Sequence, residues 1–332
     1  MKRKNITITV ALFCISVFCI SMLSACAQGN SASAGAMNGK GLHAMLTISD
    51  GSDAFRSTLA SAAQEAAQEA GMTLTIEDAA GSIEAQMNQI KNAKDADVII
   101  CALCDSSTAQ EMEVIAGDTP IVFINSCPEE DYLESNRYVY VGSDEAVAGG
   151  IQAEYVLEKY ASKNTLNVVI IKGEKTHSAT KGRTRAVKSV LEASGKTINY
   201  VFEDYADWST DDAKNMFNLF LKTGQEVDCV ISNNDSMALG VVAAAKENGI
   251  DLQAMPILGV DATTDGLAAV AAGDMACTVF QPAKGQGQAA VKAAITLVKG
   301  GNIASLEGAE ENGMYVWVPF ESVTESNVKE YQ

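Results

Sequence analysis

The 332-residue sequence has little positive charge: 24 Lys and Arg stand against 42 Asp and Glu, which gives a formal net charge of −18. This balance disfavours nucleic acid and anionic lipid as partners. The sequence also lacks a Gly-x-Gly-x-x-Gly turn after a strand, a Gly-x-Ser-x-Gly nucleophile elbow and a phosphate-binding loop. We therefore do not expect an enzyme.

Metal ligands are equally scarce, because His43 and His177 are the two histidines of the chain. Cys101-Ala-Leu-Cys104 has the spacing of a redox or metal motif, but no second pair follows it, and it ends an apolar run where buried cysteines are common. We expect no metal and no cofactor. Export would permit one disulfide among the cysteines beyond the N-terminal segment, which are Cys101, Cys104, Cys127, Cys229 and Cys277.

The N-terminus carries an export signal. A basic start (Lys2, Arg3, Lys4) precedes an apolar stretch that ends in Leu-Ser-Ala-Cys26. These four residues resemble the lipobox of bacterial lipoproteins, which implies a signal peptide over 1–25, a lipidated Cys26 and an extracytoplasmic location on the bacterial cell membrane. The alternative is an uncleaved anchor, but the apolar stretch is marginal for a span. Residues 26–40 are small and polar and predict a flexible tether.

Beyond the tether, short β-branched runs alternate with longer amphipathic stretches, which predicts parallel sheets covered by helices, in two α/β lobes. The expected strands are Leu42–Ile48, Thr73–Ile76, Val98–Cys101, Ile121–Ile124, Asn167–Ile171, Ile198–Phe202, Val227–Ile231, Ile257–Val260 and Cys277–Val279. The expected helices are Ala54–Ala70, Ile83–Ala93, Asp144–Lys159, Lys181–Glu192, Asp211–Lys222, Ser236–Asn248 and Lys284–Val298.

Polar and aromatic residues follow these strands, where ligands bind in open α/β sheets. Carboxylates, amides and a guanidinium can bind the hydroxyls of a neutral polyhydroxylated solute, and aromatic faces can cover its apolar C–H groups. Each residue also has a structural interpretation, such as a helix N-cap for Asp53 and Asn234 or packing for Trp208. Their shared position favours a binding site made of Asp53, Phe55, Asn125, His177, Arg183, Trp208, Asn234, Asp261 and Gln281.

Several segments in order also resemble the sugar-binding, type I class of periplasmic binding proteins, the soluble components of bacterial sugar ABC importers; galactose/glucose and ribose binders are nearest. The segments are Tyr140–Asp144 (YVGSD), Gly149–Ala153 (GGIQA), Asp228–Gly240 (DCVISNNDSMALG), Ile257–Thr263 (ILGVDAT) and Cys277–Gln281 (CTVFQ). The resemblance implies two doubly wound lobes joined by a three-segment hinge, 41–142 plus 283–308 and 143–282 plus 309–332, with the ligand between them.

The resemblance also implies roles for the nine residues. Phe55 and Trp208 would sandwich the sugar ring, and the others would bind its hydroxyls. Ala179 departs from the hexose binders, which place an aspartate there, and 161–165 lacks a calcium-ligand series. The expected function is capture of a monosaccharide, a hexose such as galactose or glucose, for an ABC permease; a pentose, another small polyol, or sensing for a chemoreceptor or signalling kinase stay open. We expect a monomer. A sugar-responsive repressor would need a basic DNA-binding headpiece instead of an export signal.

Overall fold

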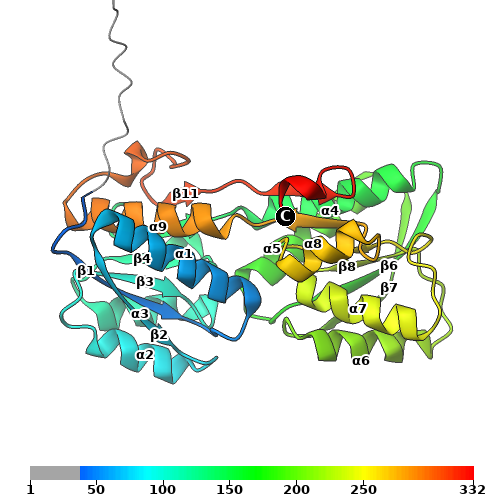
Figure 1. Cartoon of the computed structure of the whole chain (residues 1–332), viewed down its shortest axis with the longest axis horizontal. Helices are drawn as coiled ribbons and strands as arrows, with labels where there is room; N and C mark the ends of the chain where they lie inside the picture. The colour runs from blue at the N-terminus through cyan, green and yellow to red at the C-terminus, as the bar shows by residue number, and fades with distance from the viewer. Residues whose placement is uncertain (1–37) are drawn as a thin grey trace, which may run out of the picture. The chain divides into compact units, whose positions relative to one another are not determined.

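The computed structural model describes residues 38–332. The predicted signal peptide, the predicted lipidation site Cys26 and residues 27–37 of the predicted tether lie outside the described residues. The described chain forms two lobes, each with one six-stranded sheet between two layers of helices (Figure 1). The predicted α/β architecture is confirmed.

The first sheet has the strand order β11-β5-β4-β3-β1-β2, and all its neighbouring strands are parallel. Its strands are β1 (His43–Ile48), β2 (Thr73–Asp78), β3 (Val98–Ala102), β4 (Ile121–Ile124), β5 (Tyr138–Gly142) and β11 (Tyr315–Trp317). The helices of this lobe are α1 (Ala54–Ala70), α2 (Ile83–Asn92), α3 (Ala109–Ala116) and α9 (Ala283–Val298).

The second sheet repeats this plan in the order β12-β10-β9-β8-β6-β7, with β12 antiparallel to β10. Its strands are β6 (Thr165–Lys172), β7 (Thr197–Tyr205), β8 (Cys229–Ser232), β9 (Ile257–Leu258), β10 (Cys277–Phe280) and β12 (Glu321–Thr324). Its helices are α4 (Glu145–Lys159), α5 (Ser178–Ala193), α6 (Thr210–Leu221), α7 (Asp235–Glu247) and α8 (Thr264–Ala271). Short 3-10 helices cover Ser106–Thr108, Glu130–Tyr132, Ile303–Ser305 and Val328–Glu330.

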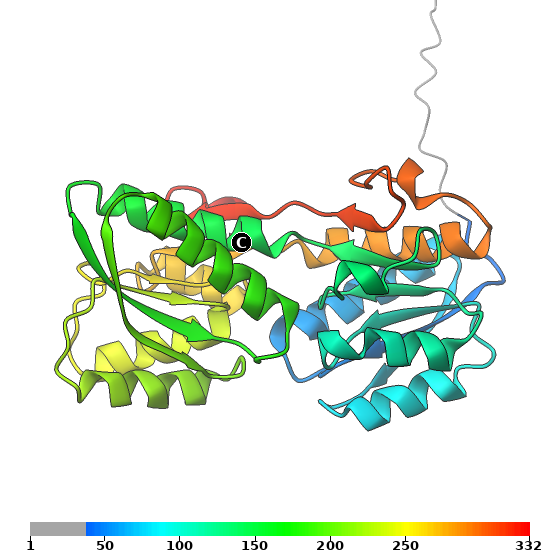
Figure 2. The same ribbon diagram turned by 180° about the vertical axis from the view of Figure 1, so that it is seen from behind.

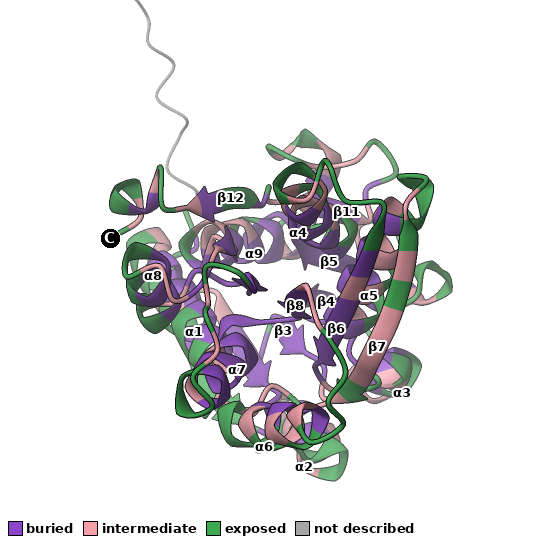
Figure 3. Ribbon diagram, turned by 90° about the vertical axis from the view of Figure 1, so that its right-hand side faces the viewer, coloured by how far each residue is buried: buried purple, intermediate pink, exposed green. Residues whose placement is uncertain are grey.

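Strand residues alternate between the two faces of each sheet, as a period of two requires. In β1, Leu46 packs with α1 and α9, whereas Met45 packs with α2 and α3. Both faces of the central strands are therefore buried, which is why β3, β4 and β8 are nearly continuous apolar runs, whereas the edge strands β2 and β7 are partly exposed. Figure 3 shows the result: central strands such as β3, β4 and β8 are purple and lie inside, the edge strand β7 is pink and green, and the helices have green outer faces.

The chain passes between the lobes three times (Figure 2). Hydrogen bonds join the crossing segments to one another. Ser143, after β5, donates to the carbonyl of Val318 at 2.5 Å and accepts from Gln286 of α9 at 2.8 Å. The backbone N–H of Val318 also donates to the carbonyl of Gly142. The hinge is therefore one hydrogen-bonded group of segments.

The last crossing lies later than the sequence predicted. We expected residues 309–332 in the second lobe, but Tyr315–Trp317 forms β11 and pairs with β5 of the first. The chain crosses after Trp317, just before β12. The boundary at 308 came from the resemblance; in the structure, Gly308 and Gly313 have positive φ values and lie before the strand that joins the first sheet.

Most predicted elements are present with end shifts of one to three residues, and α1 has its predicted bounds. The sequence reading missed β5, β11, β12, α3 and α8. The missed helices are eight residues each, and α8 contains Gly266, so neither offers a long helical period. Within 38–332, no helix is long and apolar enough to cross a membrane.

Gly149 and Gly150 of α4 provide a matched test of helix packing. A Cβ on Gly149 would lie 2.3 Å from the carbonyl oxygen of Arg183 in α5, whereas a Cβ on Gly150 meets nothing within 4 Å. We expect Gly149→Ala to lower the free energy of unfolding by about 1–3 kcal/mol. Gly150→Ala should raise it by about 0.5–1 kcal/mol, because alanine is the better helix former. Urea unfolding measures both, and equal stability of the two variants would contradict the packing described.

Candidate ligand-binding cleft

A cavity lies where the carboxyl ends of the two sheets face each other. The space that its walls leave free is about 20 Å³, so the side chains of the two lobes nearly meet there. All nine predicted residues line it, together with Arg56 and Ala179: the full set is Asp53, Phe55, Arg56, Asn125, His177, Ala179, Arg183, Trp208, Asn234, Asp261 and Gln281. The structure thus brings the predicted set together; that its members bind a ligand stays a prediction.

The first lobe contributes the loop after β1 and the residue after β4. Asp53 is the N-cap of α1, and its Oδ1 accepts from the backbone N–H of Arg56 at 2.8 Å. Asn125 has a φ of 61°, in the left-handed region that asparagine tolerates better than most residues. Capping and backbone geometry therefore fix these side chains before any ligand arrives.

The second lobe presents His177 as the N-cap of α5. Its Nδ1 accepts from the backbone N–H of Ala179, which places the ring proton on Nε2, and Nε2 lies 3.2 Å from Oδ1 of Asn125. Burial lowers the pKa of His177 well below its ordinary value, and the charges of Arg56 and Arg183 lower it further. His177 is therefore a neutral donor that does not titrate near pH 7.

Trp208 occupies a strained backbone position beside this histidine. Its φ is 67°, in a region that bulky side chains rarely adopt. The indole lies directly over Gly173, where a Cβ would come within 2.2 Å of the ring. It also meets the ring of His177 edge-on at 5.3 Å. Gly173 thus makes room for an aromatic wall of the cavity.

Arg183 of α5 is the most connected side chain of the cleft. It is 3 % exposed. Its Nε donates to Glu145 at 2.6 Å, Nη1 to the carbonyl of Asn233 at 2.6 Å, and Nη2 to Oε1 of Gln281 at 2.9 Å. Oδ1 of Asp261 lies 3.6 Å from Nη1. Oε1 of Gln281 is engaged by this contact, which leaves its amide N–H₂ as the group free to donate into the cavity.

Asp261 and Asp235 form a buried acidic pair behind Arg183. Asp261 has a φ of 114°, a strained position. Asp235 accepts from Thr278 at 2.6 Å and from the backbone N–H of Thr263 at 2.9 Å. Burial raises the pKa of Asp235 to about 7 and that of Asp261 well above its ordinary value, and the charge of Asp235 raises the pKa of Asp261 further.

Asn234 caps α7: its Oδ1 accepts from the backbone N–H of Met237 at 3.0 Å. Asn234 therefore caps a helix and also lines the cavity. The oxygen serves the helix, and the amide N–H₂ is left for the cavity that Asn234 lines.

The sequence reading missed Arg56 and the supporting acids Glu145, Glu174 and Asp235. The position of Arg56 does indicate a special environment, because a cation in the first turn of a helix opposes the helix dipole and needs a compensating partner. Glu145 and Asp235 directly follow the helix caps Asp144 and Asn234, and in the sequence they resemble ordinary acids of a first helical turn.

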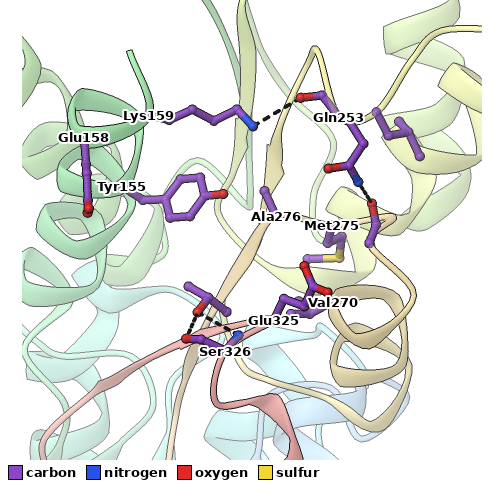
Figure 4. Close-up of a pocket in the computed structure, with 12 residues that line it drawn as sticks. Tyr155, Glu158, Lys159, Gln253, Val270, Met275, Ala276, Glu325 and Ser326 are labelled. Atoms are coloured by element: carbon purple, nitrogen blue, oxygen red, sulfur yellow. Dashed lines mark hydrogen bonds between the residues drawn. The ribbon is translucent and has the colours of Figure 1, made fainter. Parts of the chain in front are cut away.

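A larger hollow, of about 880 Å³, lies on the second lobe away from these residues (Figure 4). Tyr155, Lys159, Gln253 and Ser326 are among its walls. Lys159 donates to the carbonyl of Gln253, whose side chain donates to the carbonyl of Gly273 (Figure 4). Its walls belong to one lobe, so hinge closure cannot enclose a molecule there.

The cysteines are structural in the described part of the chain. Cys101, Cys104, Cys127, Cys229 and Cys277 are all unpaired. Cys101 packs in the core of the first sheet, and burial raises the pKa of Cys104 to about 11, so both remain protonated thiols at neutral pH. Among residues 38–332 there is no group of three acidic, histidine or cysteine side chains placed to hold a metal ion.

Residues 44–302 match the family model described as "Periplasmic binding protein domain". A putative rhizopine-binding protein from Rhizobium meliloti is 34% identical over 79% of this chain and 83% of its own. The chain belongs to the sugar-binding, type I family of periplasmic binding proteins. This family consists of non-enzymatic, extracytoplasmic binding proteins, and the predictions of an α/β binding protein and of no enzyme are confirmed.

Other members of the family resemble the chain over most of its length. A D-galactose/methyl-galactoside binding periplasmic protein from Haemophilus influenzae is 28% identical over 81% of this chain and 85% of its own. Among solved structures, an ABC transporter solute binding protein from Bacillus halodurans with bound myo-inositol has a TM-score of 0.77 and 29% identity, and the match covers 90% of this chain and 98% of that one.

The raised pKa of Asp235 predicts a pH effect on stability. An acid whose pKa is higher in the folded state than in the unfolded state destabilises the fold as pH rises from the unfolded value to the folded one, here from about 4 to about 7. Asp235→Asn removes this penalty, since the amide can direct its oxygen to Thr263 and its N–H₂ to Thr278. We expect the unfolding free energy of the variant to rise relative to the parent across this window.

Chemical denaturation at pH 4, 5, 6 and 7 measures that difference. Asp212→Asn, which removes an exposed carboxylate of the same lobe, is the control and should run parallel to the parent. If the unfolding free energies of the parent and of Asp235→Asn change with pH in parallel, the raised pKa of Asp235 is refuted.

Proposed function

We propose that this solute-binding protein captures a single monosaccharide, a hexose such as galactose or glucose, and delivers it to an ABC importer. The observation that carries the proposal is the convergence of nine polar and aromatic residues from both lobes on one small cavity. Sugars present alternating hydroxyls and apolar C–H faces, and this wall offers carboxylates, amides, a guanidinium and two aromatic rings.

Capping and ion pairing leave specific groups for the solute. The carboxyl group of Asp261 makes no side-chain hydrogen bond within the described chain, so its oxygens are open to a hydroxyl of the solute. Asp53 has used Oδ1 for its helix, which leaves Oδ2. Phe55 and Trp208 line the same cavity and are proposed to cover the two faces of the ring.

Closure follows from a solute that contacts both lobes. Such a solute stabilises the closed state by the difference between its affinities for the closed and open states. Water is then excluded, so a sugar with an inverted hydroxyl leaves a buried group unpaired, at about 1–3 kcal/mol. The closed surface is the proposed signal for the permease, and a chemoreceptor or signalling kinase is a second proposed reader. The proposed working unit is a monomer, anchored through a lipid on Cys26.

A cyclitol or another small polyol, pentoses included, is the second candidate. Ala179 is buried in the cavity wall at a position where hexose binders place an aspartate, so one hydroxyl anchor is missing. The relative from Bacillus halodurans was solved with myo-inositol, a ring of six carbons without a ring oxygen.

A thermal-shift panel of hexoses, pentoses, inositols and amino acids tests the solute class. A solute at about 100 times its dissociation constant stabilises the folded state by about 2.7 kcal/mol. We expect at least one sugar or polyol, and no amino acid, to raise the melting temperature. A shift with amino acids alone would refute the proposal.

Affinity of the best solute for two variants tests the site. Asp261→Ala and Trp208→Ala should each weaken binding, measured by calorimetry, by about 5- to 100-fold, because they remove a buried acceptor and an aromatic wall. Asp211→Ala, an exposed acid of α6, is the control and should bind as the parent does. Parental affinity in both site variants would refute the site.

Metabolic labelling with a fatty-acid precursor tests the anchor. The parent should be labelled and Cys26→Ser should not, whereas Cys19→Ser, in the same segment, should remain labelled. Label that persists in Cys26→Ser would refute lipidation at Cys26.

A further inference from the structure

One loop of the second lobe makes a row of contacts with the first lobe. Just before α5, the carbonyl of Thr176 accepts from Ser106 Oγ at 2.7 Å, and Oγ of Ser178, the first residue of α5, accepts from the backbone N–H of Cys127 at 2.8 Å. His177 meets Asn125 in the same row, as described above. The lobes are therefore joined across the cleft by protein groups alone.

Within residues 38–332, the one ion pair between the lobes joins Arg56 to Glu174 of this loop. Nη2 of Arg56 lies 3.3 Å from Oε2 of Glu174, and Nε lies 3.4 Å from Oδ1 of Asn125. Arg56 is 4% exposed, whereas the side chain of Glu174 is about one-third exposed. A cation buried in the first turn of α1 is unfavourable by itself. The contacts with Glu174 and Asn125 explain why the fold tolerates the buried charge of Arg56.

Arg56 also has donors to spare. A guanidinium carries five N–H donors, and the described contacts use those of Nε and one of Nη2. Nη1 has no hydrogen-bond partner within the described chain, and Arg56 is one of the residues that line the cavity. Its free donors are therefore available to a hydroxyl or ring oxygen of a solute.

We propose that Arg56 is a solute-contacting latch: Nη2 holds Glu174 of the opposite lobe while Nη1 donates to an oxygen of the solute. The solute contact rests on the proposed function; the latch does not. A solute that fills the cavity removes water from around the Arg56–Glu174 pair, which strengthens the pair. Arg56 would thereby be a specificity-determining residue that couples recognition of one oxygen to closure.

X-ray scattering of the solute-free protein tests the latch. Arg56→Met and Glu174→Gln should both increase the radius of gyration, because each removes the ion pair that holds the lobes together. The controls are Arg137→Met and Glu203→Gln, which remove ion pairs that lie within one lobe. Glu174→Gln keeps Arg56 and its packing, so it remains informative if Arg56→Met folds poorly. Parental scattering from Glu174→Gln would overturn the latch.

Deoxy analogues of the bound solute test the contact. In the parent and in Glu174→Gln, removing the oxygen that meets Nη1 should weaken binding about tenfold, whereas Arg56→Met should bind this analogue and the full solute with similar affinity. If every deoxy analogue loses affinity equally in the parent and in Arg56→Met, the contact is refuted. A parent that binds no sugar or polyol refutes the proposed function and this contact together, and scattering still decides the latch.

Discussion

The burial of one guanidinium, that of Arg183, is the constraint on which the cleft depends. Such a charge is tolerated only where hydrogen-bond acceptors surround it, and here they come from the start of α4, the end of β8, the segment after β9 and the second hinge crossing. Satisfying Arg183 therefore fixes the relative positions of segments that are distant in the sequence. The Glu145 carboxylate is held against it immediately after the first hinge crossing, so the site and the hinge share one network.

The fold was largely predictable because its signals are local. Alternating strand and helix patterns indicate two α/β lobes, each with a largely parallel sheet. Glycines such as Gly71, with a φ of 73°, end helices where the sequence predicts their ends. The third hinge crossing was mispredicted because β11 is three residues long and its pairing with β5 is a long-range contact. A sequence pattern carries no information on which of two similar sheets a short strand joins.

The convergence of these residues on one cavity was predictable, because a strand end places its residues at a known edge of the sheet. The sequence does not reveal which residues of the set bind one another and which have free groups that face the cavity. Gln281 and Asp261 follow different strands, yet both serve Arg183. Asp235 resembles a helix N-terminal acid in the sequence, but Gly259 and Gly266 make a cradle for its carboxylate, where a Cβ on either would come within about 2.2 Å. Such fits depend on tertiary contacts between glycines and side chains that no local pattern records.

Three of the cavity residues, Asp53, His177 and Asn234, are also helix caps. A substitution at any of them would change the cavity wall and also cost about 1 kcal/mol of helix stability. Selection would therefore resist change at these positions twice over. Substitutions that change the solute would therefore be tolerated best at wall positions that cap no helix, such as Ala179. A laboratory search for altered specificity would best begin at that position.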